Sequence, residues 1–259
     1  MTLENKVAII TGGAGGIGSA TADLYASQGA KVVIADTNEQ AGKKLEGMIR
    51  KKNGEATFCK VDVSDYNSVK NLIDFTVEKY GSLDVLFNNA GIGIRKPFLE
   101  LDLKSYHQVI EVNQHGVFYG IQTAAKKMVE LKKKGVIINT SSINAFVAMA
   151  DRFAYQVSKS AIKMMITSAA FELAPHGIRV VGIAPGSVNT DILQFHRKEG
   201  TLELARRGQM TNRLIEPEEI AQVVAFLGSD ESSSINGSIV KVDDGALGFK
   251  FRFDQKQSK

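Results

Sequence analysis

The sequence predicts an α/β fold in which a doubly wound sheet of seven parallel strands is covered by helices on both faces. Short β-branched runs recur along the chain with helix-like stretches between them, and each run is apolar almost throughout. Strands of that kind are buried on both faces, as in a parallel sheet between two layers of helices. The predicted strands cover residues 7–10, 31–35, 56–61, 83–87, 135–139, 179–183 and 238–242.

The chain is expected to form one domain. Its 259 residues suffice for one large α/β domain, and no stretch has the composition of an interdomain linker. We expect the domain to span residues 1–249 and a basic C-terminal tail to follow at residues 250–259. Residues 191–213 are polar and charged and interrupt the strand pattern, which is typical of a lid over a binding site.

Composition and charge argue against several classes of protein. Apolar residues make up 44% of the chain and charged residues 23%, as in ordinary soluble enzymes. The net charge is +4, and the ten-residue tail holds four Lys or Arg and one Asp, so the rest of the chain is nearly neutral. A nucleic-acid-binding protein would spread a basic surface over its fold. The lone cysteine, Cys59, excludes an internal disulfide.

Metal, membrane and secretion signals are not found in the sequence. The four histidines are scattered without the spacing of metal ligands, and no apolar run approaches the roughly 18 residues of a membrane span. The N-terminus shows no signal-peptide pattern. We therefore expect a cytoplasmic protein with no metal site and with neither nucleic acid nor membrane as a partner.

A glycine-rich stretch, TGGAGGIG at residues 11–18, follows the first predicted strand and opens the first helix. Glycines let the backbone approach a ligand closely, and the N–H groups at a helix N-terminus attract a pyrophosphate. The stretch fits two registers, Gly13-x-Gly15-x-x-Gly18 and Gly12-x-x-x-Gly16-x-Gly18, and the glycine count does not choose between them. Its place in the chain predicts a Rossmann-type dinucleotide site.

The second predicted strand leads into Asp36, eighteen residues past Gly18, close to the spacing of a ribose-binding acid. A carboxylate there accepts hydrogen bonds from both ribose hydroxyls and repels a 2′-phosphate, and no Lys or Arg follows until Lys43. NAD(H) is therefore favoured over NADP(H). Asp36 is also suited to capping the next helix, as are Thr37 and Asn38.

A tyrosine and a lysine, Tyr155 and Lys159, lie four residues apart in a helical pattern and therefore share one helix face. A free phenol has a pKa of roughly 10, and a fixed cation nearby favours the phenolate, which suits proton exchange near neutral pH. Such pairs also occur by chance on solvent-exposed faces. Other motifs along the chain decide whether this pair is catalytic or a chance pair on a solvent-exposed face.

Those motifs are Asn88-Asn-Ala-Gly91, Asn113, Ser142 and Pro185-Gly-Ser-Val-Asn-Thr190. Together with the glycine stretch, their order and spacing resemble the classical branch of the short-chain dehydrogenase/reductase family, over about residues 5–247. The resemblance implies a nicotinamide-linked enzyme that interconverts a secondary alcohol and a ketone. It also implies a homo-oligomer, a dimer or tetramer, because the helix bearing the tyrosine commonly packs against its copy in this family.

The resemblance also implies a set of cofactor-binding residues. It selects the register Gly12, Gly16 and Gly18 and places Asp62 beside the adenine, although Asp62 could instead be a helix cap. The stretch from Pro185 to Thr190 would surround the nicotinamide. The whole expected set is Gly12, Gly15, Gly16, Ile17, Gly18, Asp36, Thr37, Asp62, Val63, Asn89, Ala90, Gly91, Tyr155, Lys159, Pro185, Gly186, Val188 and Thr190.

Four residues are implied to carry the chemistry. Tyr155 would be the general acid/base, and Lys159 would lower its pKa and hold the nicotinamide ribose. Ser142 would bind the reacting oxygen and stabilise its developing charge. Asn113 would hold a water that relays protons from Lys159. Ser141 is the competing serine, and Ser142 is preferred because it stands thirteen residues before Tyr155, the usual interval of the family.

The substrate is the least determined part of the prediction. Two departures from the family pattern, Ile143-Asn-Ala145 after the serines and Val242-Asp-Asp-Gly245 near the end, remove no catalytic group. The pocket is expected to be bounded by residues 92–95, by the apolar stretch 144–150 and by the basic lid. A hydrophobic substrate such as a hydroxysteroid or bile acid fits this setting, unless the lid charges only face water.

Three alternatives stay open on the same residues. They are a 3-oxoacyl thioester reductase, a sugar or polyol dehydrogenase, and a regulator that senses NAD(H) without turnover. The first usually uses NADPH, which Asp36 disfavours, and the last has no use for a proton relay. Met164 and Met165 are expected to fill a core or a subunit interface.

Overall fold

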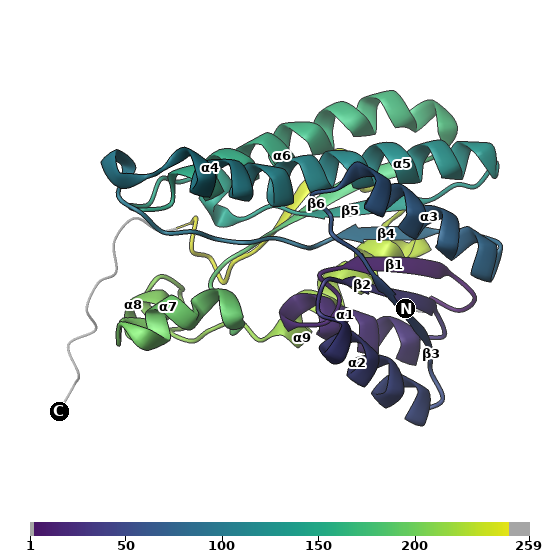
Figure 1. Cartoon of the computed structure of the whole chain (residues 1–259), viewed down its shortest axis with the longest axis horizontal. Helices are drawn as coiled ribbons and strands as arrows, with labels where there is room; N and C mark the ends of the chain where they lie inside the picture. Colours follow the sequence, from purple (N-terminus) through teal and green to yellow (C-terminus); the bar gives the residue numbers. More distant parts are fainter. Residues whose placement is uncertain (1–2, 249–259) are drawn as a thin grey trace.

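Seven parallel strands form one sheet in the order β3-β2-β1-β4-β5-β6-β7 (Figure 1). The computed structural model describes residues 3–248, apart from the side chains of residues 195 and 196. Each predicted strand overlaps one observed strand, so the predicted fold class is confirmed. The bounds are β1 Val7–Thr11, β2 Lys31–Asp36, β3 Glu55–Lys60, β4 Val85–Asn88, β5 Val136–Thr140, β6 Arg179–Pro185 and β7 Ile239–Val242.

Helices cover both faces of the sheet (Figure 1). One face is covered by α1 Gly16–Ser27, α2 Glu39–Lys51 and α9 Pro217–Gly228, and the other by α3 Tyr66–Tyr80, α5 Gly116–Glu130 and α6 Phe153–Leu173. Consecutive residues of a strand point to opposite faces, so Ala8 and Ile10 join one core and Ile9 the other. Each strand therefore contributes side chains to both cores. For this reason polar and apolar residues do not alternate along these strands.

The strand order reverses between β1 and its two neighbours, β2 and β4. In open α/β sheets a ligand binds at this point, outside the carboxyl ends of the strands. A cavity lies there, and its lining includes Gly12 after β1, Asn89 after β4, Ser141 after β5 and Pro185 in β6. The topology thus gathers residues from distant parts of the sequence at one edge of the sheet.

The segment predicted as a lid is helical. A 3-10 turn at Asp191–Leu193 leads into α7 Gln194–Lys198 and α8 Leu202–Arg207, which lie apart from the sheet (Figure 1). A bridge between Val188 and Ile215 joins the two ends of this segment. Its function as a lid stays a prediction.

Two further sequence predictions concern the chain as a whole. The predicted basic tail, residues 250–259, lies outside the described residues. Among the residues that are described, no helix is both long and apolar enough to cross a membrane.

Candidate active site

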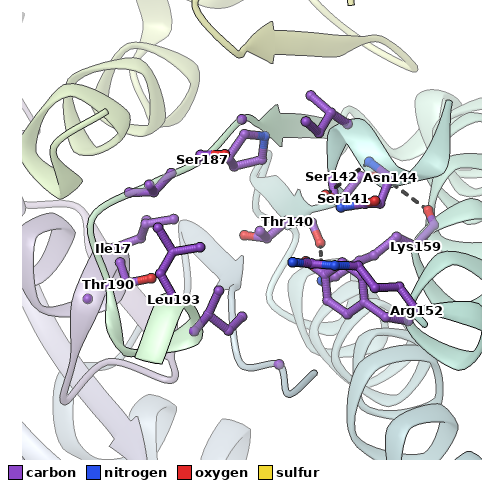
Figure 2. Close-up of a pocket in the computed structure, with 18 of the residues that line it drawn as sticks. Ile17, Thr140, Ser141, Ser142, Asn144, Arg152, Lys159, Ser187, Thr190 and Leu193 are labelled. Carbon is purple, nitrogen blue, oxygen red and sulfur yellow. Dashed lines mark hydrogen bonds between the residues drawn. The ribbon is translucent and has the colours of Figure 1, made fainter. Parts of the chain in front are cut away.

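The cavity has a volume of about 670 Å³ and two facing walls. Figure 2 shows Ile17, Thr190 and Leu193 on one wall. The opposite wall carries Ser141, Ser142, Asn144, Arg152 and Lys159 (Figure 2). The first wall comes from the start of α1 and the segment after β6, and the second from the end of β5 and the start of α6.

The glycine stretch forms the turn between β1 and α1. Gly12 and Gly16 have φ values of +60° and +51°, which only glycine adopts readily. A Cβ on Gly18 would lie 2.0 Å from the carbonyl oxygen of Gly12, so α1 could not pack against the turn. A Cβ on Gly15 would meet nothing within 4 Å, and this residue lines the cavity. The backbone conformation at Gly12 and Gly16 and the close packing at Gly18 thus explain why glycine stands at each position of this register.

Asp36 lies at the end of β2 and lines the same cavity. Its Oδ2 accepts a hydrogen bond from the N–H of Ala14 at 3.0 Å, and its Oδ1 accepts one from the N–H of Asn38 at 2.9 Å. Asn38 provides the N-cap of α2, because its side chain accepts from the N–H of Ala41. Capping is therefore done by Asn38, and the carboxylate of Asp36 is held beside the glycine turn.

Ser142, Tyr155 and Lys159 meet on one wall of the cavity. The Lys159 Nζ donates to the carbonyl oxygen of Thr140 at 2.7 Å and lies 5.6 Å from the centre of the Tyr155 ring. Ser142 is hydrogen-bonded to Tyr155. Ser141 instead donates to the carbonyl oxygen of Lys159 at 3.1 Å, which ties α6 to the end of β5. The structure therefore gives the two serines different partners.

Burial dominates the electrostatics of this wall. It raises the pKa of the Tyr155 phenol, against the opposing effects of the Ser142 hydrogen bond and the positive charge of Arg152. Burial also lowers the pKa of Lys159 to about 8. The family resemblance implied that Lys159 would lower the pKa of Tyr155, and here the structure differs. The net change is upward because desolvation of the phenolate outweighs the nearby charges, and the cation that opposes it is Arg152.

Asn113 lies behind the cavity wall, in a π-helical turn at Glu111–His115 between α4 Leu103–Ile110 and α5. Its Oδ1 accepts from the N–H of Ile92 at 2.8 Å, and its Nδ2 donates to the carbonyl of Ile92 at 2.9 Å and to Ser158 Oγ at 3.1 Å. Single π-turns are frequent at functional sites. A Cβ placed on Gly91 would lie 3.3 Å from Asn113 Oδ1 and 3.6 Å from Lys159 Nζ.

The sequence of this chain is similar to those of known proteins. A family model described as enoyl-(acyl carrier protein) reductase matches residues 12–246. The short-chain dehydrogenase reductase 3c of Arabidopsis thaliana is 38% identical over 249 residues, which cover 95% of this chain and 95% of that protein. The chain belongs to the short-chain dehydrogenase/reductase family. Members of this family are oxidoreductases that use nicotinamide cofactors.

Two other proteins that are similar to this short-chain dehydrogenase/reductase have names that indicate different substrates. The 2,5-dichloro-2,5-cyclohexadiene-1,4-diol dehydrogenase of Sphingobium indicum is 37% identical over 243 residues, 94% of this chain and 96% of the relative. The crystal structure of levodione reductase has a TM-score of 0.89 and 31% identity, and the match covers 95% of this chain and 99% of that one. The relatives thus differ in substrate although they share the fold.

Most of the expected cofactor residues of this short-chain dehydrogenase/reductase line the cavity. Those that do are Gly12, Gly15, Gly16, Ile17, Asp36, Asn89, Ala90, Gly91, Tyr155, Lys159, Pro185, Gly186, Val188 and Thr190. Gly18, Thr37, Asp62 and Val63 are not among the lining residues. The Oδ1 of Asp62 accepts from the N–H and the hydroxyl of Ser64 at 2.9 and 2.7 Å, while Asp65 caps α3. The contact of Asp62 with adenine stays a prediction.

The cavity of this short-chain dehydrogenase/reductase also contains an arginine that sequence reasoning did not assign. Arg152 precedes α6 and lines the cavity, and no motif in the sequence pointed to it. Asn144 begins the stretch that was predicted to bound the pocket; it lines the cavity and is buried, and its Nδ2 donates to Ser142 Oγ at 3.3 Å. No group of three or more His, Cys, Asp or Glu gathers into a possible metal site within the described part of the chain.

Proposed function

We propose that this protein is an NAD(H)-dependent oxidoreductase that interconverts a secondary alcohol and a ketone. The observation that carries the proposal is the meeting of Ser142, Tyr155 and Lys159 on one wall of a cavity that also contains the glycine turn and Asp36. One cavity then contains a proton donor, Tyr155, a hydroxyl that can bind the reacting oxygen, Ser142, and the glycine turn that can bind a dinucleotide. Hydride transfer to a carbonyl needs all three.

The residues present fit a nicotinamide dinucleotide. The space that a Cβ on Gly15 would fill is open, and α1 begins there without a side-chain cap, so its first N–H groups are suited to a pyrophosphate. The nicotinamide supplies or accepts the hydride when the cofactor is bound. Asp36 would bind the adenosine ribose, and its negative charge supports a preference for NAD(H) over NADP(H). Pro185, Val188 and Thr190 would border the nicotinamide.

The wall residues would move and hold a proton at the substrate oxygen. The phenol of Tyr155 has a raised pKa and is therefore protonated at neutral pH, the form that donates a proton during ketone reduction. The hydroxyl of Ser142 would stabilise charge on the same oxygen. Lys159 would hold the nicotinamide ribose. Asn113 would maintain the loop beside it through its two hydrogen bonds to Ile92.

The substrate is proposed to be hydrophobic. Val147, Met149, Ile192 and Leu204 line the cavity, and all four are at least 45% exposed, so they offer an apolar surface to a bound molecule. A hydroxysteroid or bile acid is the first candidate. A sugar or polyol fits such walls poorly, and the carboxylate of Asp36 argues against an NADPH-linked 3-oxoacyl thioester reductase.

The protein is also proposed to act as a homo-oligomer, a dimer or tetramer. Met164 and Phe171 on α6 are 66% and 85% exposed, and Phe118 on α5 is 45% exposed, so these helices carry apolar side chains that a second copy would cover. Met165 instead packs partly into the core. A cytoplasmic location stays a prediction.

The proposal is tested by the initial rate of absorbance change at 340 nm. NAD⁺ and NADP⁺ are compared across bile acids, neutral hydroxysteroids, polyols and 3-hydroxyacyl thioesters. NAD⁺-linked oxidation that Tyr155→Phe lowers at least about 100-fold is expected, with Tyr119→Phe as a matched control outside the cavity lining. Preference for NADP⁺ with thioesters would contradict the proposal. Tight NADH binding without turnover on any substrate would favour the regulator that senses NAD(H).

A further inference from the structure

Ser142 has a second polar neighbour in the cavity wall, which is Asn144. A 3-10 turn at Ile143–Ala145 directly follows Ser142 and brings Asn144 back to the serine. The backbone N–H of Asn144 donates to Ser142 Oγ at 3.1 Å, and its Nδ2 donates to the same oxygen at 3.3 Å. Figure 2 shows the two residues side by side. Ser142 is 5% exposed and Asn144 8%, so water competes little for these bonds.

These two bonds use all the acceptor capacity of Ser142. A serine hydroxyl has one hydrogen to donate and two lone pairs that accept. Asn144 donates to Ser142 Oγ twice, once from the backbone and once from the side chain, so both lone pairs are occupied. No acceptor site is then left for the hydroxyl of Tyr155. The hydrogen bond between Ser142 and Tyr155 therefore runs from the serine O–H to the tyrosine oxygen.

The effect of this bond on Tyr155 has the sign of a donated hydrogen. The Ser142 hydrogen bond lowers the pKa of Tyr155, against the larger effect of burial. A donor stabilises the ionised phenol, whereas an acceptor would stabilise the neutral one. The charged residues in the cavity lining are Asp36, Arg95, Arg152, Lys159 and Asp191. All five stay in place in the variants below, so a change at Tyr155 reports on the serine.

The oxygen of the Asn144 amide takes no part in this network. Its Oδ1 is buried and has no hydrogen-bond partner among the described residues. A buried carbonyl oxygen without a partner costs free energy on folding, because the water that it binds in the unfolded chain is lost. An apolar side chain of the same size would avoid that cost. Stability therefore does not explain the amide at this position, and its bond to Ser142 does.

We propose that Asn144 is a positioning residue that directs the hydroxyl hydrogen of Ser142 toward Tyr155 and the reacting oxygen of the substrate. The inference rests on the proposed function and adds a residue to its machinery. Without the amide, one lone pair of Ser142 is free to accept from the Tyr155 hydroxyl, and the serine hydrogen can turn away. Ser142 then no longer stabilises the negative charge that develops on the substrate oxygen.

Two substitutions keep the size of Asn144 and change what it offers to Ser142. Asn144→Leu removes the side-chain donor. Asn144→Asp replaces the donor with a carboxylate oxygen, which accepts the serine hydrogen and so draws it away from Tyr155. Asn144→Leu should lower kcat/KM at least about tenfold, and Asn144→Asp further. The control is Asn67→Asp, the same change at an exposed residue in the first turn of α3, which should leave kcat/KM unchanged.

The ionisation of Tyr155 tests the direction of the hydrogen without turnover. NMR of the full-length protein with isotope-labelled tyrosine rings follows the six tyrosines, and Tyr155→Phe identifies the signal. Ser142→Ala should move the titration of Tyr155 to higher pH, because a donor to the phenolate is lost. Asn144→Leu should move it in the same direction. Added to Ser142→Ala, it should cause no further shift, because Asn144 acts through the serine hydroxyl.

Thermal unfolding separates positioning from folding. The melting temperature of Asn144→Leu should equal or exceed that of the wild type, because the unpaired buried oxygen is removed together with the bond. Wild-type kcat/KM and titration in Asn144→Leu would overturn the proposal. A shift of equal size in the Ser142→Ala background would also overturn it, because Asn144 would then act on Tyr155 without the serine.

The kinetic comparison uses NAD⁺ and whichever alcohol is oxidised fastest among the bile acids, hydroxysteroids, polyols and 3-hydroxyacyl thioesters named above. If none is oxidised while the titrations connect Asn144 to Tyr155 through Ser142, the proposed reaction fails and the positioning stands. If oxidation depends on Tyr155 but Asn144→Leu matches the wild type in rate and titration, the positioning fails and the reaction stands.

Discussion

Arg152 and Tyr155 lie three residues apart at the start of α6, and the positive charge of Arg152 opposes the rise in the Tyr155 pKa that burial causes. An arginine that sequence reasoning did not single out therefore acts on the predicted general acid/base. The effect has a measurable consequence for the pH dependence of the reaction.

Arg152→Gln should move the alkaline inflection of alcohol oxidation to higher pH. Oxidation needs the ionised phenol of Tyr155 as base, and removal of a nearby cation makes ionisation harder. The measurement is the pH profile of kcat/KM with a neutral alcohol, compared with Arg152→Lys, which keeps the charge. An inflection that is the same in the wild type and in Arg152→Gln would show that another group controls the profile.

Lys159 should make the enzyme without cofactor more stable as pH rises above 8. Burial lowers its pKa from 10.5 to about 8, so between these values the unfolded chain binds a proton that the folded chain does not. Unfolding free energy then increases with pH, by about 3 kcal/mol in total, and the charged lysine costs that amount below pH 8. Lys159→Met should lose this rise and be more stable at pH 7.

Urea unfolding at pH 7, 8, 9 and 10.5 measures the effect of Lys159. The matched control is Lys163→Met, an exposed lysine on the same helix, which should keep the wild-type dependence on pH. Parallel curves for the wild type and Lys159→Met would contradict a lowered pKa.

Asp36→Asn should relax the preference for NAD(H). The substitution keeps the size of the side chain and removes the negative charge that repels a 2′-phosphate. The ratio of kcat/KM for NADP⁺ to that for NAD⁺ should rise at least about tenfold. Asp65→Asn, which alters the cap of α3, should leave the ratio unchanged. A wild type that already prefers NADP⁺ would refute this assignment of Asp36.

Two glycines of the same turn should respond in opposite ways to a methyl group. In Gly18→Ala the new Cβ would lie 2.0 Å from the carbonyl oxygen of Gly12, so a loss of stability of at least about 2 kcal/mol is expected. In Gly15→Ala the Cβ meets no protein atom within 4 Å and the φ of −152° suits alanine, so the melting temperature should not change.

Gly15→Ala should nevertheless weaken NADH binding at least about tenfold, because the methyl group would project into the space proposed for the pyrophosphate. Fluorescence titration with NADH measures this loss. Unchanged affinity would place the pyrophosphate elsewhere.

Met164→Glu and Phe171→Glu should reduce the oligomer to smaller species. Both side chains are exposed and lie seven residues apart, two helical turns, on one face of α6. Light scattering coupled to size exclusion measures the mass, with Lys104→Glu on α4 as a control for added negative charge. A wild type that is monomeric at micromolar concentration would contradict the proposed assembly.

The sequence by itself determined the fold class and most of the cavity lining. The strands could be located because a parallel strand must be apolar on both faces, as Ala8, Ile9 and Ile10 are in their two cores. The glycine turn could be located because a close backbone approach excludes a Cβ, as at Gly18. Both constraints are local, so each can be recognised in the sequence from a few adjacent residues.

Only the tertiary structure decided the electrostatics of the site and the place of Arg152 in its wall. The pKa of Tyr155 depends on how much water its phenol keeps, which no i,i+4 spacing encodes. The loop after β4 is joined to the segment before α6 by a hydrogen bond from the N–H of Lys96 to the carbonyl oxygen of Asp151, two residues fifty-five positions apart. Asn113 gained its geometry from a π-turn that has no signal in the sequence. Burial and long-range proximity are properties of the packed molecule, so they appear only when the chain has folded.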